Sequence, residues 1–140
     1  MKELKISIIT VSFNQGEFIR SNIESVLSQN YNNYEHIIID GGSTDNTVSI
    51  LKEYPHLNWI SEKDKGQSDG LNKGFKKATG DIIAWINSDD MLAPNALSII
   101  NNFFQQNPDK YVLTGNQVLI DRNEKKIKTI PAETFKYTIL

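Results

Sequence analysis

The chain has 140 residues, 39% of them hydrophobic and 23% charged, which is typical of one soluble globular domain with a real core. Its net charge of -2 argues against a nucleic-acid surface, because such a surface needs a basic stripe to neutralise phosphates. Without cysteine there can be no disulfide or thiolate metal site, so any metal must use oxygen or histidine ligands. No apolar run is long enough to span a bilayer, so we expect a cytoplasmic protein, or one peripheral to the membrane in its full-length form.

The first half of the chain predicts two strands and two helices. Residues 6–12 and 34–40 are short apolar runs, rich in β-branched side chains, as in strands that are buried on both faces. Apolar residues recur at helical spacing over residues 17–29, so an amphipathic helix should connect these strands. Residues 43–46 offer several N-capping side chains and predict a second helix, which ends at Pro55.

The second half continues the same alternation. Residues 57–61 and 82–86 give a third and a fourth strand. The helix between them should end at Gly80, since glycine takes the left-handed conformation most easily. Pro94 suits the first position of a fourth helix, which Pro108 stops. This order predicts an α/β fold whose mainly parallel, Rossmann-like sheet carries helices on both faces.

A small antiparallel addition is predicted toward the C-terminal end. Residues 111–114, 118–120 and 127–130 look like short strands, the last two joined by a turn at residues 121–123. No repeat or linker divides the chain, so we expect residues 1–140 to form a single domain.

Carboxylates gather where the predicted strands end. Ligands of open α/β sheets bind outside the carboxyl ends of the strands, so these positions are the first place to look for a site. The segments that follow the four strands are Phe13-Asn14, Asp40-Gly41-Gly42, residues 62–66 and residues 87–90. Three of the four carry acidic side chains, which should all face one edge of the sheet.

Asp89 and Asp90 form the most informative pair. Two adjacent acids repel each other unless a cation or hydrogen bonds offset the repulsion. Mg²⁺ and Mn²⁺ accept such oxygen ligands and share them with substrate phosphates. The alternative is that Asp90 or its neighbour caps the helix entered through Pro94. We interpret His36 and His56 as structural or exposed side chains rather than as ligands.

Two further segments allow a functional and a plain interpretation. Asp40 continues a buried strand and should sit at the open edge, able to accept a hydrogen bond from a base or a sugar, although the glycines after it also suit a simple tight turn. Residues 62–66 could be a solvated charged loop. Their position equally makes Asp64 a candidate for contacting a nucleoside, with Lys65 or Lys73 available for phosphate.

Four linked segments resemble the family 2 glycosyltransferases of GT-A fold, in the same order and spacing as far as about Leu113. They are SIITVSFN, IIIDGGSTDNT, SEKDKGQSDGLNKGF and ATGDIIAWINSDD. The resemblance implies metal-dependent, inverting transfer of a sugar from a nucleotide-sugar, UDP-linked by preference, to a hydroxyl of a carbohydrate or lipid-linked acceptor. It suggests cell-surface polysaccharide or glycolipid synthesis, and it leaves homo-oligomerisation open.

The resemblance also implies roles for individual residues. It assigns Asp90 to the metal, Mn²⁺ or Mg²⁺. Asn87 stands where many relatives have an aspartate, which leaves one metal contact in doubt. For the nucleotide, the resemblance implies Val11 and Phe13 beside the base, Asp40 on the base, Asp64 on the nucleoside and Asp89 on the ribose.

No catalytic base is assigned in this chain. Inverting members place an Asp or Glu base beyond a further acceptor-binding region, which these 140 residues do not reach, and Glu133 lacks the matching context. The chain by itself could therefore be an inactive donor-binding fragment.

Two other nucleotide-binding classes fit less well. A dinucleotide-binding oxidoreductase shares the strand and helix order, but residues 13–16 lack the G-x-G-x-x-G pattern that admits a pyrophosphate. A nucleotidyltransferase would need a glycine-rich, basic phosphate loop after the first strand, and that loop is absent from the sequence.

Overall fold

The computed structural model describes residues 3–132, in two compact units divided between Phe103 and Phe104. The first unit is built on a parallel sheet with strand order β3-β2-β1-β4. The strands are β1 (Ile6–Ser12), β2 (Tyr34–Asp40), β3 (Asn58–Ser61) and β4 (Ile82–Trp85). The predicted α/β fold with a mainly parallel sheet is confirmed, and the first two strands have the predicted bounds.

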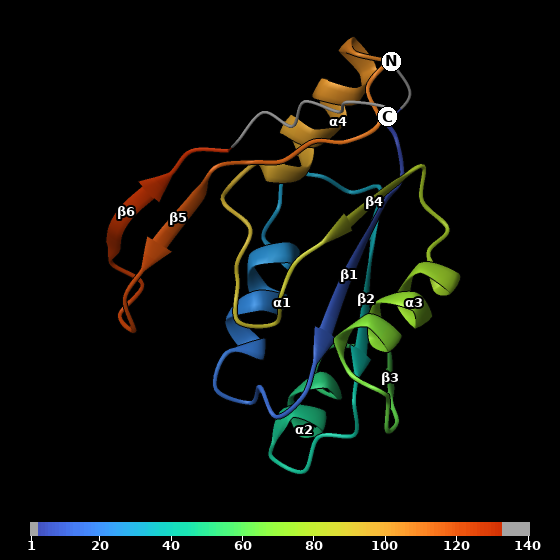
Figure 1. Ribbon diagram of the computed structural model, residues 1–140, viewed down its shortest axis with the longest axis vertical. Coiled ribbons are helices and arrows are strands. Elements are labelled where there is room, and N and C mark those ends of the chain that lie inside the picture. The colour runs from blue at the N-terminus through green and yellow to red at the C-terminus, as the bar shows by residue number, and fades with distance from the viewer. Residues whose placement is uncertain (1–2, 133–140) are drawn as a thin grey trace, which may run out of the picture. The chain divides into compact units, whose positions relative to one another are not determined.

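Helices cover both faces of this sheet, as predicted, and Figure 1 shows α1 and α3 on opposite sides of β1 and β2. The helices are α1 (Ile19–Leu27), α2 (Thr47–Leu51), α3 (Gln67–Lys77) and α4 (Ala96–Gln106), the last of which crosses the boundary between the units. None of the helices within residues 3–132 is long and apolar enough to cross a membrane.

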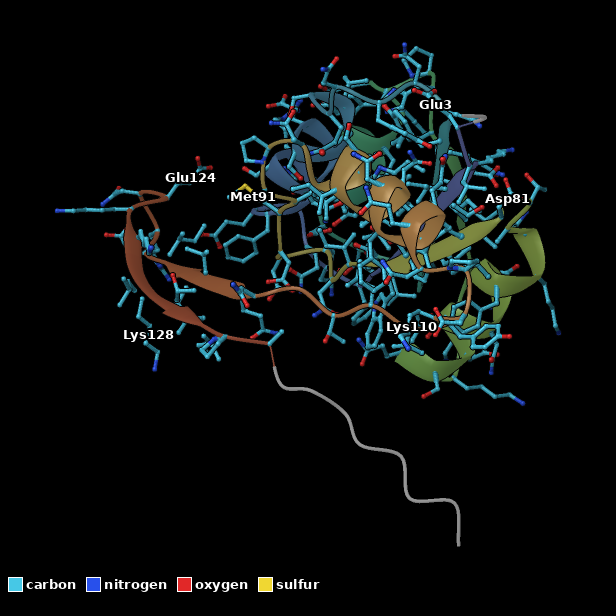
Figure 2. All side chains as sticks on the ribbon, turned by 90° about the horizontal axis from the view of Figure 1, so that it is seen from above. Glu3, Asp81, Met91, Lys110, Glu124 and Lys128 are labelled. Carbon is cyan, nitrogen blue, oxygen red and sulfur yellow. The ribbon has the colours of Figure 1, made fainter. Side chains whose placement is uncertain are left out.

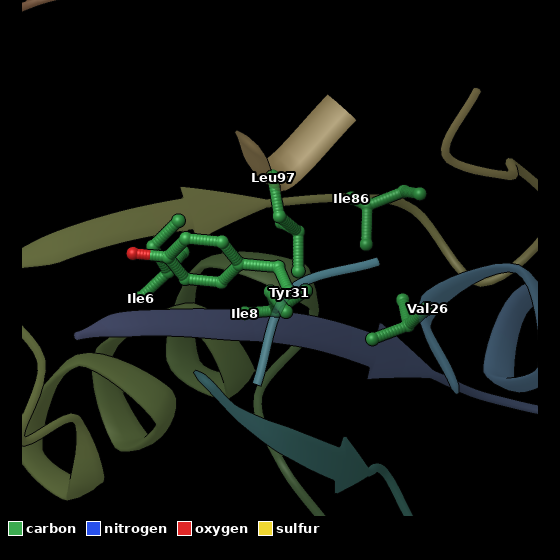
Figure 3. Close-up of a cluster of buried hydrophobic side chains, with 6 residues drawn as sticks. All are labelled: Ile6, Ile8, Val26, Tyr31, Ile86 and Leu97. Atoms are coloured by element: carbon green, nitrogen blue, oxygen red, sulfur yellow. The ribbon is translucent and has the colours of Figure 1, made fainter. Parts of the chain in front are cut away.

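Alternate residues of each central strand enter different parts of the core. One face of the sheet packs against α1 and α4 through the buried cluster drawn in Figure 3, whose members are Ile6, Ile8, Val26, Tyr31, Ile86 and Leu97. On the opposite face, Val11, Ile37 and Ile39 pack with Leu71 of α3. Because both faces are covered, β1 is apolar almost throughout.

The second unit contains an antiparallel hairpin of β5 (Gln117–Ile120) and β6 (Lys126–Ile130). The turn lies where the sequence predicted it, and the N–H of Asp121 donates to the carbonyl of Lys125 at 2.9 Å. Every residue of both strands is exposed, and Figure 2 shows their side chains, with Lys128 on β6 and Glu124 at the turn. Backbone pairing between the two strands and hydrogen bonds to the Asp121 carboxylate within the turn hold the hairpin together.

Three local predictions are wrong. The first is Gly80, which does not end α3: the helix ends at Lys77, Ala78 is extended, and Gly80 is not among the described glycines with positive φ. A Cβ at Gly80 would lie 2.7 Å from the carbonyl oxygen of Lys5, so this position needs glycine for close packing against the chain before β1.

The other two concern the segments on either side of α4. Pro94 opens a turn rather than the helix, because Asn95 has a φ of 62° and α4 begins only at Ala96. Residues 111–114 form no strand, since a strand needs a hydrogen-bonded neighbour and none of the described strands pairs with them.

Candidate functional site

A pocket of about 820 Å³ opens at the carboxyl ends of β1, β2 and β4, the edge where the sequence predicted ligands to bind. Its volume lies in the range of small-molecule sites. Of the residues predicted for the nucleotide, four line the pocket and belong to three separate segments: Val11, Phe13, Asp64 and Asp89. Asp40 and Asp90 are not among its lining residues.

The end of β1 contributes one buried and one exposed apolar side chain. Val11 is 9% exposed and belongs to the core against α3. Phe13 follows the last residue of the strand and is 59% exposed, although it is a large aromatic residue. An exposed ring at the rim of a pocket offers a flat surface on which a base can stack.

Asp40 lies at the end of β2, but its side chain turns into the protein and is fully buried. Its carboxylate accepts hydrogen bonds from the N–H groups of Gly42 (3.2 Å) and Ser43 (2.9 Å) and from the hydroxyl groups of Ser43 and Ser61 (2.6 Å for Ser61). The carboxylate is therefore not exposed at the open edge, where the sequence predicted it to lie. Instead, its hydrogen bonds hold the loop that follows β2, residues 41–45, which we call the glycine loop.

The same loop is tied to the loop that follows β1. The N–H of Asn14 donates to the hydroxyl of Ser43 (2.8 Å), and the N–H of Thr44 donates back to Asn14 Oδ1 (2.9 Å). The N–H of Gly16 donates to Asp45, which also binds the first turn of α2 and lies one residue before the helix N-cap. These hydrogen bonds hold the loop after β1 against the loop after β2.

Asp64 sits directly against the glycine loop. Its Oδ1 accepts the N–H of Gly66 at 2.9 Å, and a Cβ built on Gly41 would lie 2.9 Å from its Oδ2. A larger residue at position 41 would displace the carboxylate, so glycine is what allows Asp64 to reach the pocket wall. Gly41 and Gly42 line the pocket themselves, and a glycine pair directly after a buried strand is the sequence signal that could have identified them.

Asp89 and Asp90 belong to a tight turn, residues 87–90, that follows β4 and that we call the acid turn. The N–H of Asp90 donates to the carbonyl of Asn87 at 3.1 Å, which closes the turn. Both aspartates are exposed. The alternative that either acid caps α4 is wrong, because that helix begins six positions after Asp90, at Ala96.

Asn87 connects Asp90 to the pocket. Its Nδ2 donates to Asp90 Oδ2 (3.0 Å), and its Oδ1 accepts a hydrogen bond from Gln67 Nε2 (3.3 Å) at the start of α3. Asn87 and Gln67 both line the pocket, and neither was predicted as a site residue. In the sequence, Asn87 stood out only because many of the proteins that the chain resembles have an aspartate at this position.

The acid turn can contribute to a metal site but cannot complete one. Within residues 3–132, no three His, Asp or Glu side chains gather closely enough to hold an ion by themselves. Asn87 binds Oδ2 of the Asp90 carboxylate, and the side chain is exposed, so Oδ1 is placed to bind a cation that is shared with a phosphate-bearing ligand. The donor set thus fits Mg²⁺ or Mn²⁺ only together with ligand oxygens or water.

The two lysines that were predicted to bind phosphate, Lys65 and Lys73, do not line the pocket. Lys73 Nζ lies 2.8 Å from a Glu62 carboxylate oxygen and 3.5 Å from Asp69, and the hydrogen bond to Glu62 raises the pKa of Lys73. Neither Lys65 nor Lys73 lines the pocket, whereas Lys63 does. Hydrophobic periodicity could not show which of these lysines lines the pocket, since all three lie in one loop and the helix that follows it.

His36 has the structural role that the sequence indicated. It is 1% exposed in the middle of β2, and the Thr10 hydroxyl lies 3.0 Å from its Nε2. Burial lowers the pKa of His36 to about 3. The imidazole is therefore neutral at physiological pH and lies in the core rather than on the pocket wall.

Comparison with known proteins places the chain in a family. The sequence profile of glycosyl transferase family 2 matches residues 7–138. An uncharacterised glycosyltransferase of Nostoc sp. is 32% identical over 129 residues, which cover 89% of this chain and 40% of that protein. One from Haemophilus influenzae is 36% identical over 137 residues, covering 89% of this chain and 52% of the relative. The chain thus spans about half or less of the length of these relatives.

Solved structures share the fold. Staphylococcus aureus TarS 1-349, in complex with UDP-GlcNAc, is 24% identical with a TM-score of 0.68 over 83% of this chain and 33% of that one. The mannosyltransferase PcManGT of Pyrobaculum calidifontis, in complex with GDP-Man and Mn2+, is 21% identical with a TM-score of 0.66 over 74% of this chain and 32% of that one. At this level of identity the likeness establishes the GT-A fold. With its sequence matched over nearly its whole length and its fold matched as well, the chain belongs to glycosyl transferase family 2.

Proposed function

We propose that the intact protein transfers a sugar from a UDP-sugar to an acceptor hydroxyl, with inversion and with Mn²⁺ or Mg²⁺ as its cofactor. The observation that carries the proposal is the pocket at the strand ends, which brings Phe13, Asp64 and Asp89 together from three segments. These residues suit a nucleotide-sugar. The exposed ring offers a surface for the base, and the two carboxylates can accept hydrogen bonds from its hydroxyl and N–H groups beside the glycine loop.

In this proposal the base lies between Phe13 and Val11, and Asp64 accepts a hydrogen bond from the nucleoside. Both Asp64 and the loop Gly41-Gly42 form the same wall, so the loop also faces the base. Asp40 then acts through that loop, because its carboxylate holds the loop and is buried behind it. We propose it as a positioning residue rather than as a direct base contact.

The acid turn holds the other end of the donor. Asp89 lines the pocket and is assigned to the ribose, and Asp90 is assigned to the metal. A bound Mn²⁺ or Mg²⁺ would stabilise the charge that develops on the departing diphosphate. Asn87 contributes by holding Asp90 with one amide hydrogen and reaching Gln67 with its oxygen.

The general base remains unassigned among the described residues. Asp109 pairs with Lys110 at 2.8 Å, and Asp121 accepts the backbone N–H groups of Asn123 and Lys125 within the hairpin turn. Glu133 lies outside the described residues. We propose that the catalytic base belongs to a region that the longer relatives have and that these 140 residues do not span. The present chain should then bind the donor but transfer sugar poorly.

The structural neighbours support a nucleotide-sugar donor but differ in its identity. TarS was solved with UDP-GlcNAc and with UDP, and PcManGT with GDP-Man and Mn2+. For the present chain we prefer UDP. We propose a carbohydrate or lipid-linked acceptor, in cell-surface polysaccharide or glycolipid synthesis, and leave the acceptor to experiment.

Calorimetric titration of the chain with UDP, GDP and ADP, each with and without Mn²⁺, tests the proposal directly. We expect UDP with Mn²⁺ to bind tightest and chelation by EDTA to weaken it strongly. Tighter binding of GDP would move the proposal to another donor class. No binding of any nucleoside diphosphate with metal present would reject it.

A further inference from the structure

Three polar side chains along one side of α1 hold the segment between β4 and α4. Asn22, Ser25 and Gln29 are three and four positions apart, so they lie along one face of the helix and its end. Ser25 Oγ accepts the N–H of Leu92 (3.0 Å), and Gln29 Nε2 donates to the carbonyl of Ala93 (3.0 Å). This polar row is exceptional on a helix whose other inward residues, such as Ile23, are apolar.

Asn22 is the member of this row that reaches the acid turn. Its Nδ2 donates to the carbonyl of Asn87 at 2.9 Å and to the carbonyl of Asp90 at 2.8 Å, so one amide group bridges both ends of the turn. The side chain is fully buried, and both of its donor hydrogens are used on these two carbonyls. In a dry environment such hydrogen bonds fix the backbone firmly.

From this arrangement we infer that Asn22 is a positioning residue of the donor site, which sets the direction of the Asp89 and Asp90 side chains by holding the backbone that carries them. Asn22 does not line the pocket, so it acts through the turn and not by touching a ligand. The inference deepens the proposed function and rests on it, because it requires Asp90 to share a metal with the donor.

Packing alone does not explain an amide at this place. A leucine of similar size would fill the same space without the cost of burying a polar group. Asn22 Oδ1 moreover has no hydrogen-bond partner among residues 3–132, so the buried amide is only partly satisfied. What the amide adds over an apolar side chain is the bridge between Asn87 and Asp90.

The expected consequence is a loss of metal-dependent binding. Outer partners that orient metal ligands typically contribute about 10–100-fold in metal affinity. Without the bridge, the acid turn keeps its two internal hydrogen bonds, from Asp90 N–H to the Asn87 carbonyl and from Asn87 Nδ2 to Asp90 Oδ2, but its backbone loses both hydrogen bonds from Asn22. Contacts to the base, which come from the other loops, should be retained.

The test compares Asn22→Leu with Gln29→Leu in the 140-residue chain. Gln29 is a matched control, because it is also buried and belongs to the same row but binds Ala93 and Leu97 instead of the acid turn. Three quantities are measured: the rate of amide hydrogen exchange at Asp90 without ligand, the calorimetric Kd of Mn²⁺–UDP, and the calorimetric Kd of metal-free uridine. If Asn22→Leu does not fold, Asn22→Ser replaces it, since a serine hydroxyl is too short to bridge both carbonyls.

We expect Asn22→Leu to accelerate exchange at Asp90 and to weaken Mn²⁺–UDP about 10–100-fold with little change for uridine, while Gln29→Leu changes neither. Unchanged Mn²⁺–UDP affinity, or equal losses for Mn²⁺–UDP and uridine, would overturn the inference and leave Asn22 a structural residue. Failure of the proposed function gives a separate result: the unsubstituted chain would not bind Mn²⁺–UDP, which would reject both the proposed function and this inference.

Discussion

The hydroxyl of Ser61, at the end of β3, donates a 2.6 Å hydrogen bond to the carboxylate of Asp40, at the end of β2. The bond joins two neighbouring strands just behind the glycine loop, in register with the pairing of Asp40 and Ser61 in the sheet. It helps to explain how a carboxylate can be fully buried at this edge of the sheet. The charge is offset by donors from its own loop and from β3.

We predict that Asp40→Asn weakens binding of uridine more than binding of Mn²⁺–pyrophosphate. The substitution keeps the shape but places an NH₂ group among hydrogen-bond donors, so the loop that we propose to face the base loosens while the acid turn is untouched. Hydrogen bonds to a charged group contribute about 1.5–3 kcal/mol, so the free energy of unfolding should fall by a similar amount. Urea denaturation and calorimetry measure the two effects.

Ser61→Ala is the graded control for this prediction, since it removes one donor to Asp40 and leaves the loop donors in place. It should lower the free energy of unfolding by about 1.5 kcal/mol, the lower end of the range for one hydrogen bond to a charged group. Equal losses of uridine and pyrophosphate binding in Asp40→Asn would show that Asp40 supports the whole site and not its base end.

Phe13→Ala should reduce UDP affinity without reducing stability. The ring is 59% exposed, so little packing is lost, whereas stacking on a base contributes about 1–3 kcal/mol. That corresponds to roughly a five- to 150-fold change in Kd. Phe75→Ala serves as the control, since Phe75 is 45% exposed on α3 and does not line the pocket. An equal effect of both substitutions would argue against stacking on Phe13.

Asp90→Asn should reproduce the effect of EDTA on UDP binding, because it removes the charge that attracts the cation and keeps nearly the same shape. UDP affinity measured with Mn²⁺ should fall to the value seen with EDTA, and EDTA should have no further effect on the variant. Asp81→Asn removes the same charge just before β4, at the opposite end of that strand, and should leave the metal dependence intact. Full metal dependence in Asp90→Asn would assign the cation to other groups.

The stability of the protein should fall as the pH falls below about 6.5, partly because of His36. Burial lowers the pKa of His36 in the folded state to about 3, against 6.5 for an exposed histidine, so the unfolded chain takes up a proton that the folded chain does not. This contribution is fully present above pH 6.5 and is lost as the pH falls toward 3. The slope is at most about 1.4 kcal/mol per pH unit.

His36→Asn, which keeps a polar partner for Thr10 but does not titrate, isolates this contribution. Urea denaturation between pH 7 and pH 4 should show a shallower loss of unfolding free energy in the variant. Parallel curves for the two proteins would mean that His36 takes up its proton equally in the folded and unfolded states.

Hydrophobic periodicity by itself determined the order of strands and helices through α4. Apolar runs such as those of β1 and β2 end at polar or glycine residues, and these local changes locate a strand end to within a residue. The edge that carries the pocket followed as well, since parallel strands place their carboxyl ends together. The predicted ends of elements were wrong where a distant contact decides the conformation. Gly80 is an example, because it packs closely against the backbone of Lys5, far away in the sequence.

The orientation of each site residue was decided only by the tertiary structure. The sequence places Asp40, Asp64 and Asp89 equally at strand ends, yet Asp40 is buried because donors from its own loop and from Ser61 surround it. The bridge from Asn22 to the acid turn joins residues 65 and 68 positions apart in sequence, and no local pattern records it. Periodicity reports which face of an element is apolar, whereas a hydrogen bond depends on which distant donor the fold brings within about 3 Å.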